Sequence, residues 1–265
     1  MDLKDMFDLS GKVALITGGN GYLGSSMSEA LAEYNATVIL ASRDINKNIK
    51  IANELTNKYH NINVPAYMDL SNEDSVKECI NKTTKEYSTI DILINNANFG
   101  AGGKMHEMPF ENWKCCLQGS IDGVFLCTKT VLLQMMRQQG GSIINIGSMY
   151  GVVPPHICVY DTPCEKNYSP VGYGVGKAGI IHLTKYIASV YSEYGIRCNC
   201  ISPGPFPNPS VQQDKDFIKR LCGQNPMGRI GQPDDLKGII LLLASNASSY
   251  ITGQNILVDG GWTTW

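Results

Sequence analysis

A tyrosine and a lysine four positions apart, Tyr173 and Lys177, are the residues of this sequence best suited to do chemistry. On a helix these positions share a face, so the phenol and the ammonium point to the same side. A free phenol titrates at about pH 10, and a nearby cation stabilises the phenolate and lowers that pKa. Tyr173 could then donate a proton to a carbonyl under reduction or accept one from an alcohol under oxidation.

Such a pair also occurs on ordinary amphipathic helices, and a solvated helix face is the alternative interpretation. Gly174, Gly176 and Gly179 weaken a helix unless another group must approach closely, which favours a functional site. Ser148 ends the preceding predicted strand. Its hydroxyl could hydrogen-bond a substrate oxygen and orient it toward the phenol, and a capping or turn role is the alternative.

A glycine-rich turn near the amino terminus joins a β-branched run to a helical segment. Its glycines let the backbone approach a pyrophosphate, while free N–H groups and the positive end of the helix dipole favour the anion. Purely structural turns of this composition are common. Here a strand precedes, a helix follows and a second strand ends about 20 residues on, as in dinucleotide sites. The residues predicted to hold the phosphates are Gly18, Asn20, Gly21, Tyr22, Leu23 and Gly24.

The second predicted strand ends in Ser42 and Arg43. An acidic residue there would hydrogen-bond the ribose of NAD and repel a 2′-phosphate, whereas a hydroxyl and a guanidinium favour NADP. We therefore expect NADP(H), with NAD(H) as the alternative cofactor. Arg43 could instead be a solvated loop residue, and Asp44 turning inward would reverse the choice.

Short β-branched runs alternate with longer helical stretches, a pattern that builds a doubly wound parallel sheet with helices on both faces. Strands are predicted at residues 13–17, 37–42, 64–68, 90–95, 142–146, 197–202 and 256–258, and helices at 22–34, 44–58, 72–87, 111–138, 172–194 and 233–244. No composition shift divides the chain, so residues 1–265 are predicted to form one α/β domain. An insert at 151–170 and a lid at 203–225 begin beyond strand ends, where ligands bind to such sheets.

Composition argues against several function classes. The 265 residues include 22 Lys plus Arg and 24 Asp plus Glu without a basic run, so neither nucleic acid nor a membrane surface is an expected partner. Contiguous apolar runs are shorter than the roughly 20 residues of a membrane span, and no leader is evident, which predicts a soluble, cytoplasmic protein. The nine cysteines and four histidines lack disulfide or zinc spacing, so reduced thiols and no metal are expected.

Seven short motifs, in order along nearly the whole chain, resemble those of the short-chain dehydrogenase/reductase family. They are Thr17-Gly18, Asp69-Leu70, Asn95-Asn96-Ala97, Ser148, Tyr173-x-x-x-Lys177, Pro203-Gly204 and Asp259-Gly260-Gly261. The resemblance implies a Rossmann-type, seven-stranded parallel sheet, a nicotinamide cofactor, and a homotetramer or homodimer. It also implies that Asp69, followed by Leu70, contacts the adenine, and that Asn95 and Ala97 line the adenosine ribose.

On the nicotinamide side, the resemblance implies that Lys177 also holds the ribose and that Pro203 and Gly204 flank the ring. Two positions depart from the family pattern. The middle glycine of the phosphate turn is replaced by Tyr22, with a glycine one position earlier. An asparagine that usually supports a water relay to the lysine aligns with Ser120, whose hydroxyl can also bond water.

A third departure is the spacing of Ser148 and Tyr173, which lie 25 positions apart, roughly double the family's usual spacing. The excess is the insert at 151–170, which offers donors, acceptors and flat rings suited to a polyhydroxylated or acidic molecule rather than an acyl chain. These side chains, with the residue just before the insert, are Tyr150, His156, Tyr160, Asp161, Glu165, Lys166 and Tyr168. The substrate contacts predicted among them are Tyr150, His156 and Tyr160. A structural loop that covers an oligomer edge is the alternative.

The insert and the chain's ending look like those of family members from sugar, sugar-acid and nonulosonic-acid pathways. The predicted function is therefore the NAD(P)-dependent interconversion of a secondary alcohol and a ketone on a small carbohydrate-like molecule. In it, Tyr173 is the acid and base, Lys177 tunes it, and Ser148 orients the carbonyl. A 3-oxoacyl-thioester reductase and a non-catalytic nucleotide-binding protein are the alternatives.

Overall fold

A seven-stranded parallel sheet forms the centre of the molecule, in the order β3-β2-β1-β4-β5-β6-β7. The computed structural model describes residues 2–160 and 169–265. Its strands are β1 (Val13–Thr17), β2 (Thr37–Ser42), β3 (Asn63–Tyr67), β4 (Ile92–Asn95), β5 (Gly141–Ile146), β6 (Ile196–Pro203) and β7 (Asn255–Val258). The chain winds outward from β1 to β3 and returns with β4 on the other side of β1. This reversal opens a crevice at the carboxyl ends of β1 and β4, where such sheets bind ligands.

The predicted doubly wound α/β fold is confirmed, and all seven predicted strands are present. The strands β1 and β2 have the predicted bounds, and the others differ by one or two residues at an end. Alternate side chains enter different cores: Ala14 and Ile16 of β1 face one, Val13 and Leu15 the other. Because both faces are covered, the strands are nearly continuous apolar runs, and this made them recognisable in the sequence.

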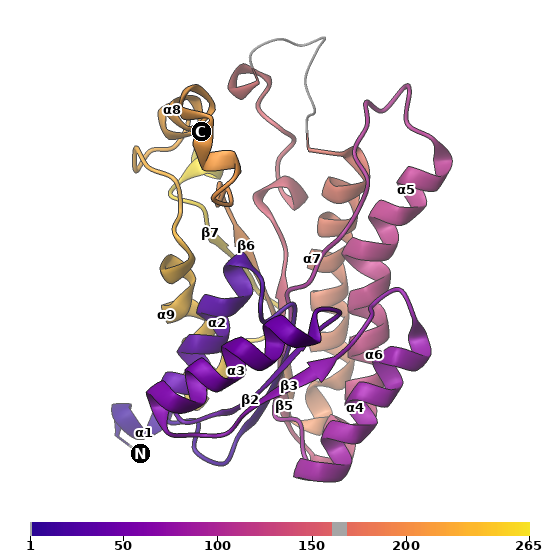
Figure 1. The fold of residues 1–265 in the computed structure, drawn as a ribbon, viewed down its shortest axis with the longest axis vertical. Coiled ribbons are helices and arrows are strands. Elements are labelled where there is room, and N and C mark those ends of the chain that lie inside the picture. Colours follow the sequence, from indigo (N-terminus) through magenta and orange to yellow (C-terminus); the bar gives the residue numbers. More distant parts are fainter. Residues whose placement is uncertain (1, 161–168) are drawn as a thin grey trace.

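Helices cover both faces of the sheet (Figure 1). One face is covered by α2 (Tyr22–Glu33), α3 (Ile45–Tyr59) and α9 (Lys237–Ala244), and the other by α4 (Glu73–Tyr87), α6 (Gly123–Gln138) and α7 (Val171–Tyr191). The shorter helices are α1 (Leu3–Phe7), α5 (Phe110–Leu117) and α8 (Lys215–Gly223). Polar caps start two of the long helices, because Asp44 accepts the N–H of Lys47 and Asn72 accepts that of Ser75.

The helix predicted over residues 111–138 is present as one continuous helical stretch, Phe110–Gln138, but it contains a π-helical turn that the sequence did not predict. A π-helical turn, Gln118–Asp122, separates α5 from α6. A Cβ on Gly119 would collide with the carbonyl oxygen of Phe99, so only glycine allows this approach. In the same turn the Ser120 hydroxyl donates to the Cys116 carbonyl. Neither contact follows from helical periodicity, and both favour a local departure from α-helical geometry.

The same stretch, Phe110–Gln138, has a length and a mean hydropathy of 1.2 that by composition alone would suit a membrane span. The sequence prediction was based on contiguous apolar runs and therefore did not identify this stretch. In the fold, half of its most apolar part is buried. Cys127, Val131 and Met135 lie in the core between α6 and the sheet. The stretch is therefore a core helix of the fold.

The lid expected at residues 203–225 contains the helix α8, which the sequence reading missed. Asp214 caps this helix by accepting the N–H of Phe217. Phe217, Ile218 and Leu221 form its apolar face and pack in one cluster. A capping residue followed by apolar residues at helical spacing indicates a helix. The four prolines just upstream led us to predict a loop instead.

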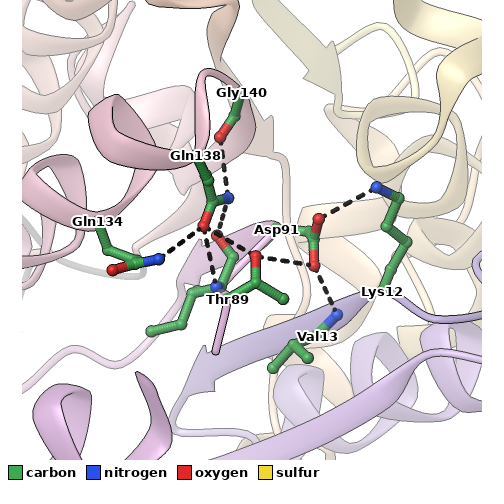
Figure 2. A network of polar contacts seen from close by, with 8 residues as sticks. Lys12, Val13, Thr89, Asp91, Gln134, Gln138 and Gly140 are labelled. Carbon is green, nitrogen blue, oxygen red and sulfur yellow. Dashed lines mark hydrogen bonds and ion pairs between the residues drawn. The ribbon is translucent and has the colours of Figure 1, made fainter. Parts of the chain in front are cut away.

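A glutamine amide ties the end of α6 to the start of β4, at the amino ends of the parallel strands (Figure 2). The Gln138 Nε2 donates to the carbonyls of Ile90 and Gly140, each at 3.0 Å. Its Oε1 accepts from the Thr89 hydroxyl at 2.8 Å and from Gln134 Nε2 at 3.2 Å. The Gln138 side chain therefore satisfies one backbone carbonyl just before β4 and one just before β5.

The neighbouring carboxylate of Asp91 extends this network to β1 (Figure 2). It accepts from Lys12 Nζ at 3.1 Å and from the backbone N–H of Val13 at 3.0 Å. The Thr89 hydroxyl lies between this carboxylate and the Gln138 amide. Together these contacts fix the start of β4 beside β1, and therefore the register of the two strands that form the crevice.

We expect Gln138→Leu to lower the free energy of unfolding by about 1–3 kcal/mol, because it leaves two partly buried carbonyls and a hydroxyl without this partner. Urea unfolding at matched protein concentration measures the change. The control is Arg137→Ala, one residue earlier on the exposed side of α6, with a cost below about 0.5 kcal/mol. Equal costs for the two variants would contradict the role given to the amide.

Candidate active site

A cavity of about 510 Å³ lies at the carboxyl ends of β1, β2, β3 and β4. Most residues predicted to bind a cofactor line it. They are Gly18, Asn20, Gly21, Tyr22, Leu23, Gly24, Ser42, Arg43, Asp69, Leu70 and Ala97. Asp44, whose inward turn would favour NAD(H), also lines the cavity. Sequence reasoning did not single out the remaining lining residues as cofactor contacts. These are Thr17, Ala41, Met68, Asn96, Asn98 and Phe99.

The turn between β1 and α2 requires glycine at two positions. Gly18 has φ +64°, a left-handed conformation that favours glycine. A Cβ on Gly24 would collide with the Gly18 carbonyl oxygen, so this glycine lets α2 pack directly against the turn. By contrast, a Cβ on Gly21 would meet only that same oxygen, at 3.1 Å. The conformation of the turn therefore depends more on Gly18 and Gly24 than on the shifted glycine, Gly21.

Asn96 holds the turn from the side of β4. Its Nδ2 donates to the carbonyls of Thr17 and Gly18 at 3.0 and 3.1 Å. The Thr17 hydroxyl in turn accepts the backbone N–H groups of Asn96 and Ala97, each at 3.0 Å. Asn95, which was expected to line the adenosine ribose, is buried below the cavity surface and donates to Thr128 and Asn145. Its neighbour Asn96 takes the place at the cavity wall.

The end of β2 presents a free cation to the cavity. The Ser42 hydroxyl accepts from Asn20 at 2.8 Å and donates to Asn48 at 2.9 Å, so it is part of a local network. Asp44 is used as the cap of α3. Arg43 is exposed, lies with its Cζ 5.7 Å from the centre of the Phe99 ring, and forms no ion pair within the described residues.

Asp69, at the end of β3, accepts from the backbone and the hydroxyl of Ser71, at 2.9 and 2.7 Å. These hydrogen bonds, with a smaller contribution from the charge of Arg43, lower the pKa of Asp69. The carboxylate therefore stays ionised and oriented at the rim of the cavity, beside Leu70. Both residues lie where the resemblance expects the adenine.

Ser148, Tyr173 and Lys177 come together beyond the end of β5. Ser148 follows β5, and the other two lie in the first turns of α7. The Lys177 Nζ donates to the Ile146 carbonyl at 2.7 Å and lies 5.5 Å from the centre of the Tyr173 ring. The side chain of Ser148 hydrogen-bonds the Tyr173 phenol. The predicted proton-transfer group is therefore assembled in the fold, with Ser148 and Lys177 almost fully buried.

Burial dominates the titration of this group. It lowers the pKa of Lys177 to about 8, because the ammonium lies in the core without a carboxylate partner among the described residues. It also raises the pKa of Tyr173, and the hydrogen bond from Ser148 offsets only part of this rise. The expected lowering of the phenol pKa by Lys177 is therefore not observed, because burial sets the direction of the shift. The phenol is neutral here and is ready to donate a proton.

Ser120 belongs to the π-helical turn and packs against the buried side of α7. It is 1% exposed, and its hydroxyl donates to the Cys116 carbonyl. A Cβ on Gly176 would collide with this hydroxyl, so the glycine of α7 allows Ser120 to approach the helix. Gly176 thus has a packing reason, and Gly172 and Gly179 on either side of the segment likewise make room for Cys116 and Ile121.

Pro203 and Gly204 lie at the end of β6, outside the large cavity. The Gly204 N–H donates to the Val258 carbonyl at 3.0 Å, and a Cβ on Gly204 would lie 2.5 Å from the Cα of Asp259. The glycine thus permits β6 and the chain's ending to pass closely. Asp259 holds that ending by accepting from Thr263 and from the N–H of Gly261.

The described part of the insert lies with α8 and the C-terminus at one end of the molecule (Figure 1). The hydroxyls of Tyr150 and Tyr160 are 3.2 Å apart, and the Tyr160 ring lies 5.9 Å from that of Phe217. His156 stacks on Trp262 with ring centres 5.1 Å apart. Asp161, Glu165, Lys166 and Tyr168 lie outside the described residues. Trp262 is the aromatic partner that sequence reasoning did not place at this site.

The two glycines of the phosphate turn give a direct test. We expect Gly24→Ala to weaken binding of NADPH by at least about tenfold, because the added methyl group separates α2 from the turn and displaces its N–H groups. Gly21→Ala should change the affinity by less than about threefold, since its Cβ has a contact that a small shift relieves. Quenching or enhancement of cofactor fluorescence measures both dissociation constants. The reverse ranking would contradict this account of the turn.

Comparison with known proteins gives relatives over the whole chain. A family model described as enoyl-(acyl carrier protein) reductase matches residues 21–263. The 3-oxoacyl-(acyl-carrier-protein) reductase of Thermotoga maritima is 32% identical over 257 residues, 96% of this chain and 98% of that protein. Sorbose reductase of Candida albicans is 34% identical over 266 residues, 99% and 90% of the two chains. The NADP-dependent mannitol dehydrogenase of Alternaria alternata is 33% identical over 266 residues, 98% and 96%.

Solved structures give the same result. A short-chain type dehydrogenase/reductase from Mycobacterium marinum is 33% identical with a TM-score of 0.89, covering 99% of both chains. A gluconate 5-dehydrogenase from Burkholderia cenocepacia, in complex with NADP and tartrate, is 29% identical with a TM-score of 0.89 over 100% of both chains. With the sheet order and the motifs described above, these findings confirm that the chain belongs to the short-chain dehydrogenase/reductase family, a family of NAD(P)-dependent oxidoreductases that act on CH–OH groups.

Proposed function

We propose that this oxidoreductase interconverts a secondary alcohol and a ketone on a small carbohydrate-like substrate, a sugar acid, polyol or nonulosonic-acid precursor, with NADP(H) as its preferred cofactor. The observation that carries the proposal is the meeting of Ser148, Tyr173 and Lys177 beyond β5, the strand next to β4, whose carboxyl end borders the cavity lined by the glycine turn. A non-catalytic nucleotide-binding protein has no chemical need for this group.

The residues of the site have separate roles in the proposal. Tyr173, neutral at physiological pH, donates its phenolic proton to the carbonyl oxygen during reduction and accepts it back during oxidation. Ser148 donates to the same oxygen and orients it. Lys177 holds its ammonium near the phenol ring, where it stabilises negative charge that develops on the phenolic oxygen. Ser120, held against Gly176, is proposed to hydrogen-bond water that reaches Lys177.

A nicotinamide cofactor would supply or accept the hydride, and the residues present fit it. The glycine turn lines the cavity at the amino end of α2, where backbone N–H groups and the helix dipole favour a phosphate. Lys177, Pro203 and Gly204 are proposed to hold the nicotinamide half. Asn95 is proposed to act indirectly, through the β4 end that carries the cavity residues.

Preference for NADP(H) rests on charge at the end of β2. Arg43 is the cation there without an ion pair among the described residues, and Asp44 is engaged as a helix cap. A 2′-phosphate would therefore meet a guanidinium, while the nearest carboxylate in the chain, that of Asp44, is held by the backbone N–H of Lys47. NAD(H) remains the alternative cofactor.

The polar rings of the insert support a hydroxylated substrate. Tyr150, His156 and Tyr160 offer hydroxyl and imidazole groups beside Trp262, whose Nε1 is buried without a partner among the described residues. Relatives named for sorbose and mannitol support the same class. A relative named for 3-oxoacyl groups makes reduction of an acyl thioester the second candidate. We further propose a cytoplasmic homotetramer or homodimer.

Turnover of purified protein with NADPH or NADP⁺ on sugar acids, polyols, keto sugars and a 3-oxoacyl thioester tests the substrate class. Activity on one carbohydrate class, with little on the thioester, is the expected result. Preference for the thioester would replace the proposal with the second candidate. Tight cofactor binding without turnover on every substrate would favour the non-catalytic alternative.

We expect Tyr173→Phe to lower kcat by about 10²- to 10⁴-fold, the usual contribution of a proton-transfer group, while the Kd of NADPH stays within about twofold. Steady-state rates and a fluorescence titration on the same sample measure the two effects. Tyr186→Phe, an exposed tyrosine on the same helix, is the control and should retain wild-type turnover. Retained turnover in Tyr173→Phe would remove this residue from the mechanism.

We expect Arg43→Leu to raise the Kd of NADPH by about 10- to 100-fold, because a charged partner of the 2′-phosphate is lost, and to change that of NADH by less than about threefold. Lys47→Leu, an exposed lysine in the first turn of α3, is the matched control for loss of one positive charge. An equal loss of affinity for both cofactors, or for both variants, would contradict a specific phosphate contact.

A further inference from the structure

One hydrogen bond joins the phosphate turn to the segment that follows β6. Gln212 Nε2 donates to the Tyr22 hydroxyl at 3.1 Å, between residues 190 positions apart in the sequence. The same Nε2 donates to the Pro207 carbonyl at 2.8 Å. Both side chains are partly buried. Tyr22 occupies the position where the family resemblance expects a glycine, so a glycine there could not make this contact.

The segment that carries Gln212 is anchored at two places. Near its start, the Pro205 carbonyl accepts the N–H of Gly231 at 2.9 Å, and the Phe206 ring lies where a Cβ on Gly231 would be. Further on, the Asn208 side chain accepts the N–H groups of Ser210 and Val211, both at 3.1 Å, and starts the 3₁₀ turn Val211–Gln213. Gln212 is therefore presented by an ordered turn and not by a loose loop.

Tyr22 lies at the nucleotide cavity. It is the first residue of α2 and lines the 510 Å³ space together with Gly21 and Gly24. In the proposed binding mode the phosphates lie at the amino end of α2 and the nicotinamide half lies near Pro203, the last residue of β6. The hydrogen bond between Tyr22 and Gln212 joins the phosphate turn to the segment that follows β6, so it connects the two parts of the chain between which the dinucleotide is proposed to lie.

We infer that Tyr22 and Gln212 form a clasp that slows release of the dinucleotide. The two side chains are positioning residues, since they bridge two protein segments and do not take part in hydride or proton transfer. The inference depends on dinucleotide binding by this family member and not on the proposed carbohydrate substrate. An oxidoreductase exchanges its cofactor in every turnover, so the clasp also sets an upper limit on kcat when release is slow.

Stopped-flow displacement of bound NADPH by excess NADP⁺ tests the clasp without any substrate. Tyr22→Phe removes only the hydroxyl, and Gln212→Leu removes the donor with little change in size. Each variant is expected to raise the dissociation rate constant about three- to tenfold, with the association rate constant within about twofold. The double variant should equal Gln212→Leu, because Tyr22→Phe removes a bond that Gln212→Leu has already removed together with the bond to Pro207. Gln213→Leu, in the same turn, is the control and should release NADPH at the wild-type rate.

Unchanged dissociation in both single variants, or effects that multiply in the double variant, would overturn the inference. Hydrogen exchange of the apo protein gives a second readout, in which the Gln212 and Gln213 amides are expected to exchange faster in Tyr22→Phe than in wild type. Equal exchange together with equal release would also overturn it. Gln212→Leu carries the test alone if Tyr22→Phe disturbs the turn. Failure of the carbohydrate panel would leave these rates unaffected, so the two proposals fail separately.

Discussion

The junction of β1 and β4 is the constraint on which the rest of the site depends. Here the winding of the sheet reverses, and the two strand ends must separate while their backbones stay hydrogen-bonded. The Thr17 hydroxyl accepts two backbone N–H groups from the β4 side, and the Asn96 amide donates to two carbonyls of the turn. The cavity exists because these bonds hold its two walls at a fixed separation, while Asp91 fixes the opposite ends of the strands.

Polar groups buried in an apolar sheet give the catalytic side its geometry. Asn95 and Asn145 link β4 and β5 to α6 through Thr128 and to α7 through Thr184, and the Lys177 ammonium hydrogen-bonds the last residue of β5. Such groups are costly unless paired, so they specify one arrangement of helix and sheet. The lowered pKa of Lys177 and the raised pKa of Tyr173 are the electrostatic consequence of this burial.

The substrate side is built differently, from aromatic contacts among segments far apart in the sequence. The described insert residues, α8 and Trp262 share one small core, and Gln212 connects the segment before α8 to the phosphate turn. This part has fewer regular hydrogen bonds than the sheet. A separate, smaller core suits a region that adapts to its substrate while the nucleotide half stays the same.

The sequence by itself determined the fold class, the seven strands, most of the cavity lining and the Ser148, Tyr173 and Lys177 group, because these depend on local period and on short motifs at strand ends. Tertiary structure decided what depends on contacts between distant segments. The π-helical turn arises where Gly119 meets Phe99, the cavity wall uses Asn96 in place of Asn95, and Tyr22 finds Gln212. The rise of the Tyr173 pKa was also decided by the tertiary structure. The spacing of Tyr173 and Lys177 predicted a lower pKa from the nearby cation, but burial by the whole fold raises it.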